Sequence, residues 1–267
     1  MANQHNGIAI ITGAAGGMGI ATAREFASKG WDLLLCDLDE TRTEAVAQTY
    51  RAEGRSAEVL AADVSASDFP ARLLALLGGR PIGAVVHTAG LSPTMATPDR
   101  IMLVNYDATA RLIEAIAPHM AEGSCAVLIS SASAYNVKSP EAEAAIRAIE
   151  RGESSAPLLA IASDSGAAYA ISKRGVQVLV EREASTFGER KARIMSISPG
   201  IIDTPMNRAE LEVHPIIANM IAGTPLRRQG LSQEIATVAA FLCSPAASFV
   251  TGSDIKVDGG VIGAMRW

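Results

Sequence analysis

The stretch from Ile8 to Gly19, IAIITGAAGGMG, places a short β-branched run directly before a glycine cluster and a helix-forming segment. This order predicts a strand, a tight turn and the start of a helix. Glycines are needed in such a turn because a side chain would keep the backbone N–H groups away from a pyrophosphate, which the positive end of the helix dipole also attracts. A glycine cluster alone is weak support for a ligand, because glycine turns without one are common.

Asp37 strengthens the prediction, because it ends the next apolar run, residues 31–36. An acidic residue roughly 20 positions beyond the glycines can accept hydrogen bonds from the adenosine ribose hydroxyls, and it would repel a 2′-phosphate. No Lys or Arg occupies positions 14–18 or 38–41, and Arg42 is the nearest cation. The pattern favours NAD over NADP. The alternative is an aspartate that only caps a turn.

Length and composition fit one α/β domain spanning residues 1–267, long enough to bury a core without disulfides. Aromatic residues make up only 4% while aliphatic residues are abundant, as in a parallel sheet covered by helices on both faces. The net charge is −5 and no basic cluster stands out, so nucleic-acid binding has no electrostatic basis.

Cysteine and histidine usage argues against disulfides and structural metal. The three cysteines are scattered through apolar segments, which predicts buried thiols in a reducing compartment, and the four histidines are equally dispersed. Residues 1–6 lack a basic region and an apolar core, and no apolar run is long enough to span a bilayer. We therefore expect a cytoplasmic protein without a membrane partner and without a metal.

Strand and helix patterns alternate along the chain, which predicts a doubly wound Rossmann-type domain with a mostly seven-stranded parallel sheet and helices on both faces. The expected strands are 8–12, 32–36, 57–61, 83–87, 125–130, 193–197 and 254–257. Small or polar residues follow every strand, and in open α/β sheets this carboxyl edge is where ligands bind.

Two segments break the regular spacing. In the first, 132–168, a helical insertion is predicted: Ser139 is the expected N-cap, Pro140 the first helical residue and Gly152 the end, with a second short helix over 157–162.

The second segment, 205–230, is rich in Met, Ile and Leu without strand alternation. It is interpreted as a helical lid over the apolar part of a substrate, the alternative being an ordinary packed helix pair.

Tyr169 and Lys173 lie one helical turn apart, so both side chains project from one face. A tyrosine titrates near ~10 and is a poor base at neutral pH, but a neighbouring cation favours the phenolate and lowers its pKa. Taken alone, this spacing arises often by chance in surface pairs.

The glycine turn, Asp37, Ser130-Ser131, the Tyr169–Lys173 pair and Pro199-Gly200 occur in the order found in the short-chain dehydrogenase/reductase family, which the chain resembles over essentially its whole length. Thr12–Gly19 resembles the TGxxxGxG motif of that family. By this resemblance the cofactor is NAD, held by Gly13, Ala15, Gly17, Met18, Gly19, Asp37, Leu38, Asp63, Val64, Ala89, Gly90, Tyr169, Lys173, Pro199, Gly200, Ile202 and Thr204.

The resemblance also implies catalytic roles. Tyr169 would exchange the proton of the reacting hydroxyl and Ser131 would orient the substrate. Lys173 would hold the nicotinamide ribose, lower the pKa of Tyr169 and pass protons towards Asn105, which matches the residue that holds a relay water. The Ile202 backbone and the Thr204 side chain would hold the nicotinamide carboxamide.

Two departures from the family pattern stand out. His87-Thr88-Ala89-Gly90 replaces Asn-Asn-Ala-Gly, and His87 is expected to be a structural histidine. The insertion at 132–168 and the ending from Gly259 resemble the bacterial 3α-hydroxysteroid dehydrogenase/carbonyl reductase branch.

These features predict an NAD-dependent oxidoreductase that interconverts a secondary alcohol and a ketone on a bulky apolar substrate, such as a steroid or an aromatic carbonyl compound. The alternatives are a 3-oxoacyl thioester reductase, a cis-dihydrodiol dehydrogenase and a non-catalytic NAD-binding sensor. The family implies a homodimer or homotetramer, and an insertion that covers the helix of Tyr169 would leave the dimer.

Overall fold

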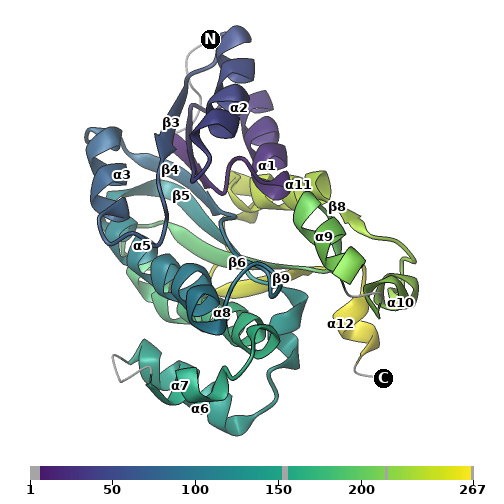
Figure 1. The fold of residues 1–267 in the computed structure, drawn as a ribbon. Helices are drawn as coiled ribbons and strands as arrows, with labels where there is room; N and C mark the ends of the chain where they lie inside the picture. The colour runs from purple at the N-terminus through teal and green to yellow at the C-terminus, as the bar shows by residue number, and fades with distance from the viewer. Residues whose placement is uncertain (1–6, 152–155, 214–215, 266–267) are drawn as a thin grey trace.

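Seven parallel strands form the central sheet, in the order β3-β2-β1-β4-β5-β6-β9 (Figure 1). The computed structural model describes residues 7–151, 156–213 and 216–265. The strand order reverses between β1 and β4, and such a switch point leaves a crevice at the carboxyl edge of the sheet. The strands are β1 (Ile8–Thr12), β2 (Leu33–Asp37), β3 (Ala57–Ala61), β4 (Ile82–His87), β5 (Met120–Ile129), β6 (Arg193–Pro199) and β9 (Ser253–Val257). The predicted doubly wound Rossmann-type fold is confirmed.

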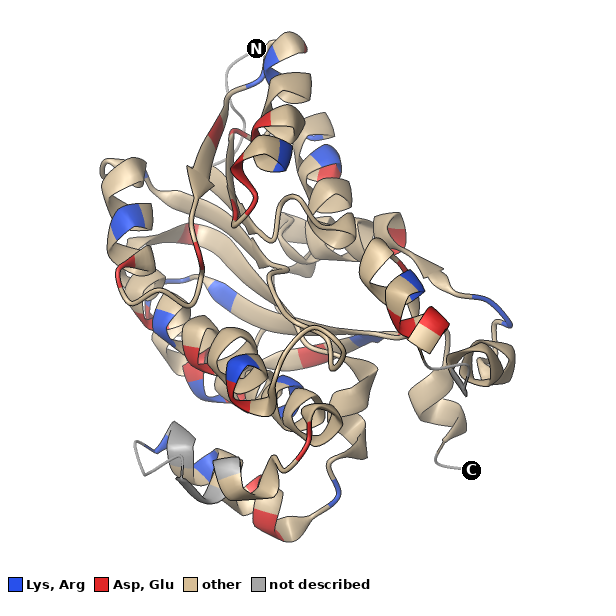
Figure 2. Ribbon diagram, in the orientation of Figure 1, with Lys and Arg blue, Asp and Glu red and all other residues tan. Residues whose placement is uncertain are grey.

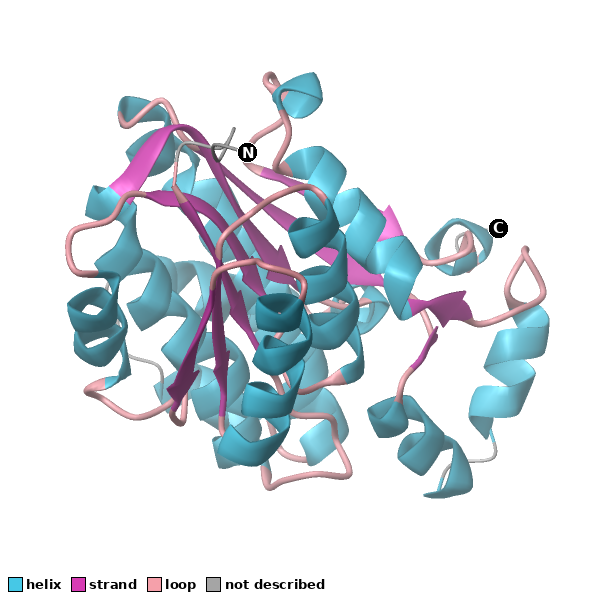
Figure 3. Ribbon diagram, turned by 90° about the horizontal axis from the view of Figure 1, so that it is seen from above, coloured by secondary structure: helices cyan, strands magenta, loops and turns pink. Residues whose placement is uncertain are grey.

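Helices cover both faces of the sheet, as the view from above shows (Figure 3). Alternate residues of β1 therefore enter two separate cores: Ala9 and Ile11 pack with Phe26 on one face, and Ile10 packs with Phe69 on the other. This double burial explains why the strands are continuous aliphatic runs. The major helices are α1 (Gly17–Ser28), α2 (Glu40–Ala52), α3 (Phe69–Leu77), α4 (Pro98–Met102), α5 (Ala108–Ile116), α8 (Ser165–Glu189) and α11 (Ser232–Leu242).

The predicted strands agree with the structure to within one residue at most boundaries, and β5 and β6 differ most. β5 begins at Met120, five residues before the predicted start, because its register slips: Ile82 pairs with Met120 whereas Ala84 pairs with Cys125. The bulge holds residues 121–124, of which Glu122 and Ser124 are polar, and this interruption of the apolar run hid the first part of the strand. β6 continues to Pro199, and a short parallel pair, β7 (Ile202–Asp203) and β8 (Gly230–Leu231), was not predicted.

The described part of the segment 132–168 forms a short 3₁₀ turn, η3 (Ala132–Asn136), then the helices α6 (Pro140–Glu150) and α7 (Ala156–Ile161), and the first turn of α8. Ser139 Oγ accepts a hydrogen bond from Ala142 N at 3.2 Å, which confirms the predicted N-cap. The predicted end at Gly152 lies outside the described residues. Ile146 and Leu158 pack with Val178 of α8, so the insertion covers one side of that long helix.

The segment 205–230 contains the two helices α9 (Pro205–Val213) and α10 (Ile216–Gly223), beside the terminal α12 (Val261–Ala264) (Figure 1). Its helical character is confirmed. Figure 2 shows Lys and Arg dispersed over the helices of this view rather than gathered in one place.

The cysteines form no disulfide in the described part of the chain. Cys36, Cys125 and Cys243 are buried and free. Over the described ranges, no group of three His, Cys, Asp or Glu side chains could hold a metal ion. None of the helices described there has the length and apolar character needed to cross a membrane.

Candidate active site

A cavity of about 280 Å³ opens at the carboxyl edge of the sheet. The glycine turn, the loop after β4, the end of β5, α8, the loop after β6 and the helices α9, α10 and α12 all contribute to its walls. Those of the predicted site residues that line it are Met18, Gly90, Ser131, Tyr169, Lys173, Pro199, Gly200, Ile202 and Thr204. The structure thus brings together side chains that are more than 180 positions apart in sequence.

The glycine turn is too crowded for side chains. A Cβ on Gly19 would lie 2.0 Å from Gly13 O, and a Cβ on Gly13 would lie 2.7 Å from Ala89 N, with Gly13 at φ +67°. Helix α1 then begins at Gly17 without a side-chain cap and without an acidic residue in its first turn. An uncapped helix N-terminus behind bare glycines fits the pyrophosphate of a dinucleotide.

Asp37 lies at the tip of β2 against this turn. Its two carboxylate oxygens accept hydrogen bonds from Ala15 N at 2.9 Å and from Asp39 N at 3.1 Å. Arg42 also reaches the turn, where its Nη2 donates to Ala15 O at 2.8 Å. An anion and a cation therefore flank the place where the adenosine ribose of a dinucleotide would lie.

The predicted adenine contacts follow β3 and differ in their surroundings. Asp63 Oδ1 accepts from Ser65 N at 2.8 Å, and Asp63 Oδ2 pairs with Arg100 Nη2 at 2.6 Å. Burial opposes ionisation of Asp63, but these hydrogen bonds hold its pKa below the ordinary value. Val64 packs against the core, whereas Leu38 is 72% exposed at the end of β2.

Ser131 and Tyr169 are joined by a hydrogen bond at the cavity wall. Ser131 ends β5 and caps η3, where its Oγ also accepts from Ser133 N at 3.1 Å. Burial raises the pKa of Tyr169, as does the nearby carboxylate of Glu210, while the hydrogen bond to Ser131 lowers it. The net direction is upward, so the expectation that the pKa of this phenol is lowered is wrong: burial and Glu210 outweigh the hydrogen bond to Ser131.

Lys173 lies almost wholly buried behind Tyr169. Its Nζ is 5.8 Å from the centre of the Tyr169 ring and donates to Ile129 O at 2.8 Å. Burial lowers the pKa of Lys173 to about 8. The ammonium is therefore close to titrating at the upper end of the physiological range.

Gly90 separates Lys173 from Asn105. A Cβ on Gly90 would lie 3.3 Å from Lys173 Nζ and 3.2 Å from Asn105 Oδ1, so the bare glycine leaves the space between the two side chains open. Asn105 lies in a π-helical turn, Leu103–Asp107, a distortion that is frequent at functional sites. Its amide bonds both backbone groups of Leu91 and donates to Ser172 Oγ at 3.3 Å, which fixes its orientation.

His87 is a fully satisfied core residue. Its Nδ1 lies 2.7 Å from Thr12 Oγ1 and its Nε2 lies 2.9 Å from Thr109 Oγ1. Thr109 already donates its hydroxyl hydrogen to Asn105 O, so the Nε2 must carry the proton and Nδ1 accepts from Thr12. Burial, together with the charge of Lys173, lowers the pKa of His87 to about 3. The interpretation of His87 as a structural histidine fits this network.

The loop after β6 forms the opposite wall. A Cβ on Gly200 would lie 2.8 Å from Asp258 Cα, so this loop packs directly on the chain that follows β9. Thr204 Oγ1 accepts from Asn207 N at 3.1 Å and begins α9, and a Cβ on Gly17 would lie 3.1 Å from the Thr204 methyl group. The first turn of α9 therefore lies against the glycine turn.

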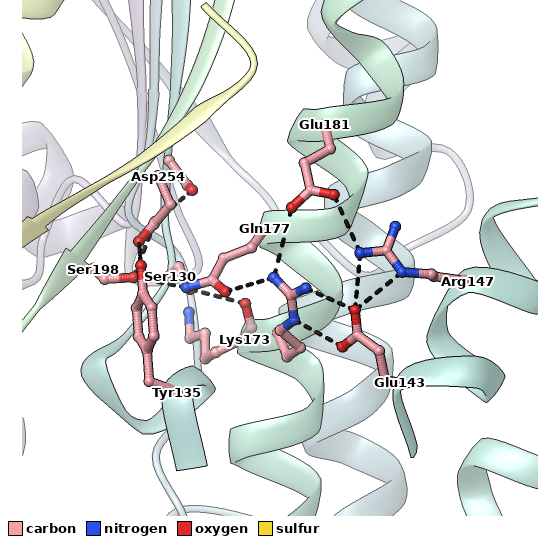
Figure 4. A network of polar contacts seen from close by, with 11 residues as sticks. Ser130, Tyr135, Glu143, Arg147, Lys173, Gln177, Glu181, Ser198 and Asp254 are labelled. Atoms are coloured by element: carbon pink, nitrogen blue, oxygen red, sulfur yellow. Dashed lines mark hydrogen bonds and ion pairs between the residues drawn. The ribbon is translucent and has the colours of Figure 1, made fainter. Parts of the chain in front are cut away.

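A polar network behind the cavity ties its elements together (Figure 4). Asp254 of β9 accepts hydrogen bonds from Tyr135 of η3 at 2.7 Å and from Ser198 of β6 at 2.9 Å. Gln177, one turn beyond Lys173 on α8, donates to the same Ser198 at 3.0 Å. The network links the segments that carry Ser131 and Tyr169.

The insertion joins this network through α6. Glu143 of α6 pairs with Arg174 of α8 at 2.7 Å and with Arg147 at 2.9 Å, and Arg147 also reaches Glu181 at 3.4 Å. Two of these bonds cross between α6 and α8 (Figure 4). The insertion is thereby fastened to the helix that carries Tyr169 and Lys173.

Sequence reasoning missed two polar residues of α9. Glu210 is buried at the cavity wall, and its Oε1 accepts from Thr94 N at 3.1 Å and Thr94 Oγ1 at 2.6 Å. Asn207 lines the same wall, and its Nδ2 is buried with no hydrogen-bond partner among the residues that the structure describes. One signal in the sequence could have pointed to Glu210: it lies four positions after Met206, so its carboxylate falls on the apolar side of the predicted helix.

Comparison with known proteins assigns the family. Residues 7–145 match the family model described as short chain dehydrogenase, and residues 153–262 match one described as enoyl-(acyl carrier protein) reductase. The chain belongs to the short-chain dehydrogenase/reductase family, and it is an oxidoreductase by that membership.

Two curated relatives extend over nearly the whole chain. The 3-alpha-hydroxysteroid dehydrogenase/carbonyl reductase of Comamonas testosteroni is 33% identical over 97% of this chain and 98% of its own length. The short-chain dehydrogenase/reductase bsc3 of Alternaria brassicicola is 34% identical over 93% of both chains. The resemblance to the hydroxysteroid dehydrogenase branch is thus supported by a full-length relative.

Solved structures agree with the fold and differ in their cofactors. The 3-alpha-hydroxysteroid dehydrogenase of Pseudomonas sp. B-0831, complexed with NADH, is 27% identical with a TM-score of 0.79, over 97% of this chain and 98% of that one. A blue fluorescent protein from a metagenomic library, in complex with NADPH, is also 27% identical, with a TM-score of 0.74 over 97% and 99% of the chains. A nicotinamide cofactor is common to both.

Proposed function

We propose that this protein is an NAD-dependent oxidoreductase that interconverts a secondary alcohol and a ketone on a bulky apolar substrate. The observation that carries the proposal is the hydrogen-bonded Ser131–Tyr169 pair, with Lys173 behind it, on a cavity at the carboxyl edge of a dinucleotide-binding sheet.

The dinucleotide would lie across the switch point of the sheet. The N-terminus of α1 fits its pyrophosphate, and Asp37 and Leu38 lie where its adenosine ribose would be held. Asp63 and Val64 would border the adenine, and Ala89 and Gly90 would support the nicotinamide half. When bound there, the nicotinamide would supply or accept the hydride.

Tyr169 would carry the proton chemistry. In ketone reduction the phenol donates its proton to the carbonyl oxygen, and in alcohol oxidation the phenolate removes the hydroxyl proton. Ser131 would hold the reacting oxygen in reach of the phenol, since the two hydroxyls already bond each other. A phenol whose pKa is raised is protonated at neutral pH, which suits the reductive direction.

Lys173 and Asn105 would form the route by which the proton reaches the phenol. Their side chains face each other across Gly90, at a spacing that a methyl group would fill. Lys173 Nζ and Asn105 would then hold a water molecule that relays the proton. Lys173 would also bind the nicotinamide ribose.

The substrate cavity is predominantly apolar where it faces α9, α10 and α12. The side chains that line it there include Met206, Ile217, Met220, Ile262 and Met265. Each of the three methionines is more than a third exposed. Flexible thioether side chains adapt to bulky apolar groups. We propose that the segment 205–230 is a lid over such a substrate, as in the interpretation of the sequence.

The test is a screen of secondary alcohols and ketones, including hydroxysteroids and aryl ketones, followed by absorbance of the reduced nicotinamide with NAD(H) and NADP(H) in parallel. We expect turnover of bulky apolar ketones with NADH as the better cofactor. Activity restricted to 3-oxoacyl thioesters or to cis-dihydrodiols would select one of the alternative enzymes. Cofactor binding without turnover of any compound would favour a sensor.

The insertion limits which surfaces of α8 can take part in an oligomer. The side of α8 that the insertion covers includes Arg174 and Val178, so we propose a homodimer formed through other surfaces rather than a tetramer that uses this one. Light scattering after gel filtration measures the mass directly. The free buried thiols fit a reducing compartment, and we propose a cytoplasmic location.

A further inference from the structure

Glu210 introduces a negative charge into a cavity whose wall on the side of the lid is mostly apolar, with Asn207 as a neutral polar neighbour. The carboxylate is buried, with 8% of the residue exposed, and it faces the cavity from the second turn of α9. An acidic side chain is rarely buried without a polar partner or a function. One partner of this carboxylate is Thr94, on the loop after β4.

Thr94 holds the carboxylate in one position. Its backbone N–H and its hydroxyl both donate to Glu210 Oε1, at 3.1 Å and 2.6 Å. These two bonds cross from the lid to the main body of the domain, 116 positions apart in sequence. The charge is therefore fixed at the wall and does not turn away into solvent.

Among the residues whose structure is described, the charged groups that face Tyr169 are Lys173 from its own helix and Glu210 from α9. Glu210 acts on Tyr169 through space, since its charge raises the pKa of the phenol. A group that affects the phenol in this way also affects any charge on a substrate held between them, because water is largely displaced from an occupied cavity.

We propose that Glu210 is a specificity-determining residue, whose fixed carboxylate makes the site select neutral or cationic alcohols and ketones over anionic ones. This inference rests on the proposed function, and it narrows the substrate class to bulky apolar compounds without a carboxylate or phosphate on the part that the lid covers. The same carboxylate would repel the phosphate groups of carrier-bound or phosphorylated thioesters and so disfavours them as substrates.

The test uses two probes of nearly equal shape, the neutral ketone 4-acetylbenzamide and the anionic ketone 4-acetylbenzoate. Reduction is followed by cofactor absorbance, and binding to the cofactor-loaded protein is measured by calorimetry. In Glu210→Gln the amide oxygen still accepts from Thr94, so the lid contact is retained while the charge is removed. Glu212→Gln, an exposed position on the same helix, is the matched control.

We expect the wild-type protein to prefer the amide in both kcat/KM and Kd. Glu210→Gln should lower that preference about tenfold, equivalent to about 1.4 kcal/mol, mainly by improving the carboxylate. The same variant should shift the pH dependence of alcohol oxidation towards lower pH, an effect that a purely structural role would not produce. Glu212→Gln should change neither quantity.

An amide-to-carboxylate ratio that is unchanged in Glu210→Gln, with the amide still reduced, would overturn this inference and leave the proposed function intact. Equal binding of both probes by the wild-type protein, or binding of neither, would also overturn it. Failure of every ketone and alcohol in the broader screen would instead reject the proposed function.

Discussion

The two halves of the carboxyl edge are built in different ways. On the side of β1 and β2, the glycine turn and Asp37 come from one βαβ unit. A Cβ on Gly19 would lie 2.0 Å from Gly13 O, and Asp37 accepts a hydrogen bond from Ala15 N at 2.9 Å, so this turn leaves no room for side chains. On the side of α9, the cavity wall is made mostly of flexible Met and Ile side chains, with the amide of Asn207 and one fixed carboxylate, Glu210. The first half is suited to one invariant ligand, whereas the second can adapt to a substrate.

The largest effect is expected from Tyr169→Phe, which removes the proton donor on the substrate side but keeps the aromatic ring. We expect kcat for ketone reduction to fall by about 10² to 10⁴-fold, the usual contribution of a general acid or base. The dissociation constant for NADH should stay within about twofold, because the glycine turn and Asp37 are untouched. Near-native turnover in this variant would remove Tyr169 from the mechanism.

Asp37→Ala tests the cofactor half. Removal of the carboxylate leaves Arg42 at the turn, 2.8 Å from Ala15 O, where it can meet a 2′-phosphate. We expect the ratio of kcat/KM for NADH to that for NADPH to fall by about 10- to 100-fold, since one charge–phosphate interaction is worth about 1.4–2.7 kcal/mol.

The double variant Asp37→Ala/Arg42→Ala is the matched control, and it should lose the gained use of NADPH. An unchanged cofactor ratio in Asp37→Ala would refute the role of this aspartate.

The pH dependence should separate the two directions of the reaction. Oxidation needs the phenolate and reduction needs the phenol, so a Tyr169 pKa raised above its ordinary value makes oxidation increase with pH into the alkaline range. Reduction should be level through neutral pH and fall only at higher pH. Profiles of kcat/KM from pH 6 to 10 test this, and an oxidation rate independent of pH over that range would contradict it.

The smallest expected effect is on stability, through His87 in the core that supports both halves. His87 has a pKa of about 3 in the folded protein and 6.5 when unperturbed, so the unfolded chain binds the extra proton between these values. Stability due to His87 is complete above pH 6.5 and is lost as the pH falls towards 3. Lowering the pH from 6.5 to 5 should reduce the free energy of unfolding by about 2 kcal/mol through this residue.

Denaturant titrations at the two pH values measure the change. His87→Gln should flatten the pH dependence, whereas His119→Gln, at an exposed position, should preserve it. A pH dependence that survives in His87→Gln would assign it to other groups.

The sequence predicted best what is local in the chain. Gly13, Gly19 and Asp37 act within one strand–turn–helix–strand unit, and the four-residue spacing of Tyr169 and Lys173 is a property of a single helix. Ser139 was found as an N-cap for the same reason, because capping depends on residues within one turn.

Features that depend on distant contacts could not be predicted. Glu210 is held in place by Thr94, which lies 116 positions earlier. The direction of the Tyr169 pKa also depends on distant contacts, because the burial of the phenol raises it most and Glu210 adds to the rise. The start of β5 was hidden because its bulge interrupts the apolar run before Cys125.

A hydride should pass from the cofactor in one half of the site to the substrate in the other while Tyr169 donates the proton, and isotope transfer can follow that hydride. NADH deuterated at C4 on the transferred face would be incubated with a ketone substrate from the screen, and the alcohol would be analysed by mass spectrometry. We expect one deuterium at the carbinol carbon with the wild-type protein and loss of this product in Tyr169→Phe. An alcohol without deuterium, or equal labelled product from both proteins, would contradict it.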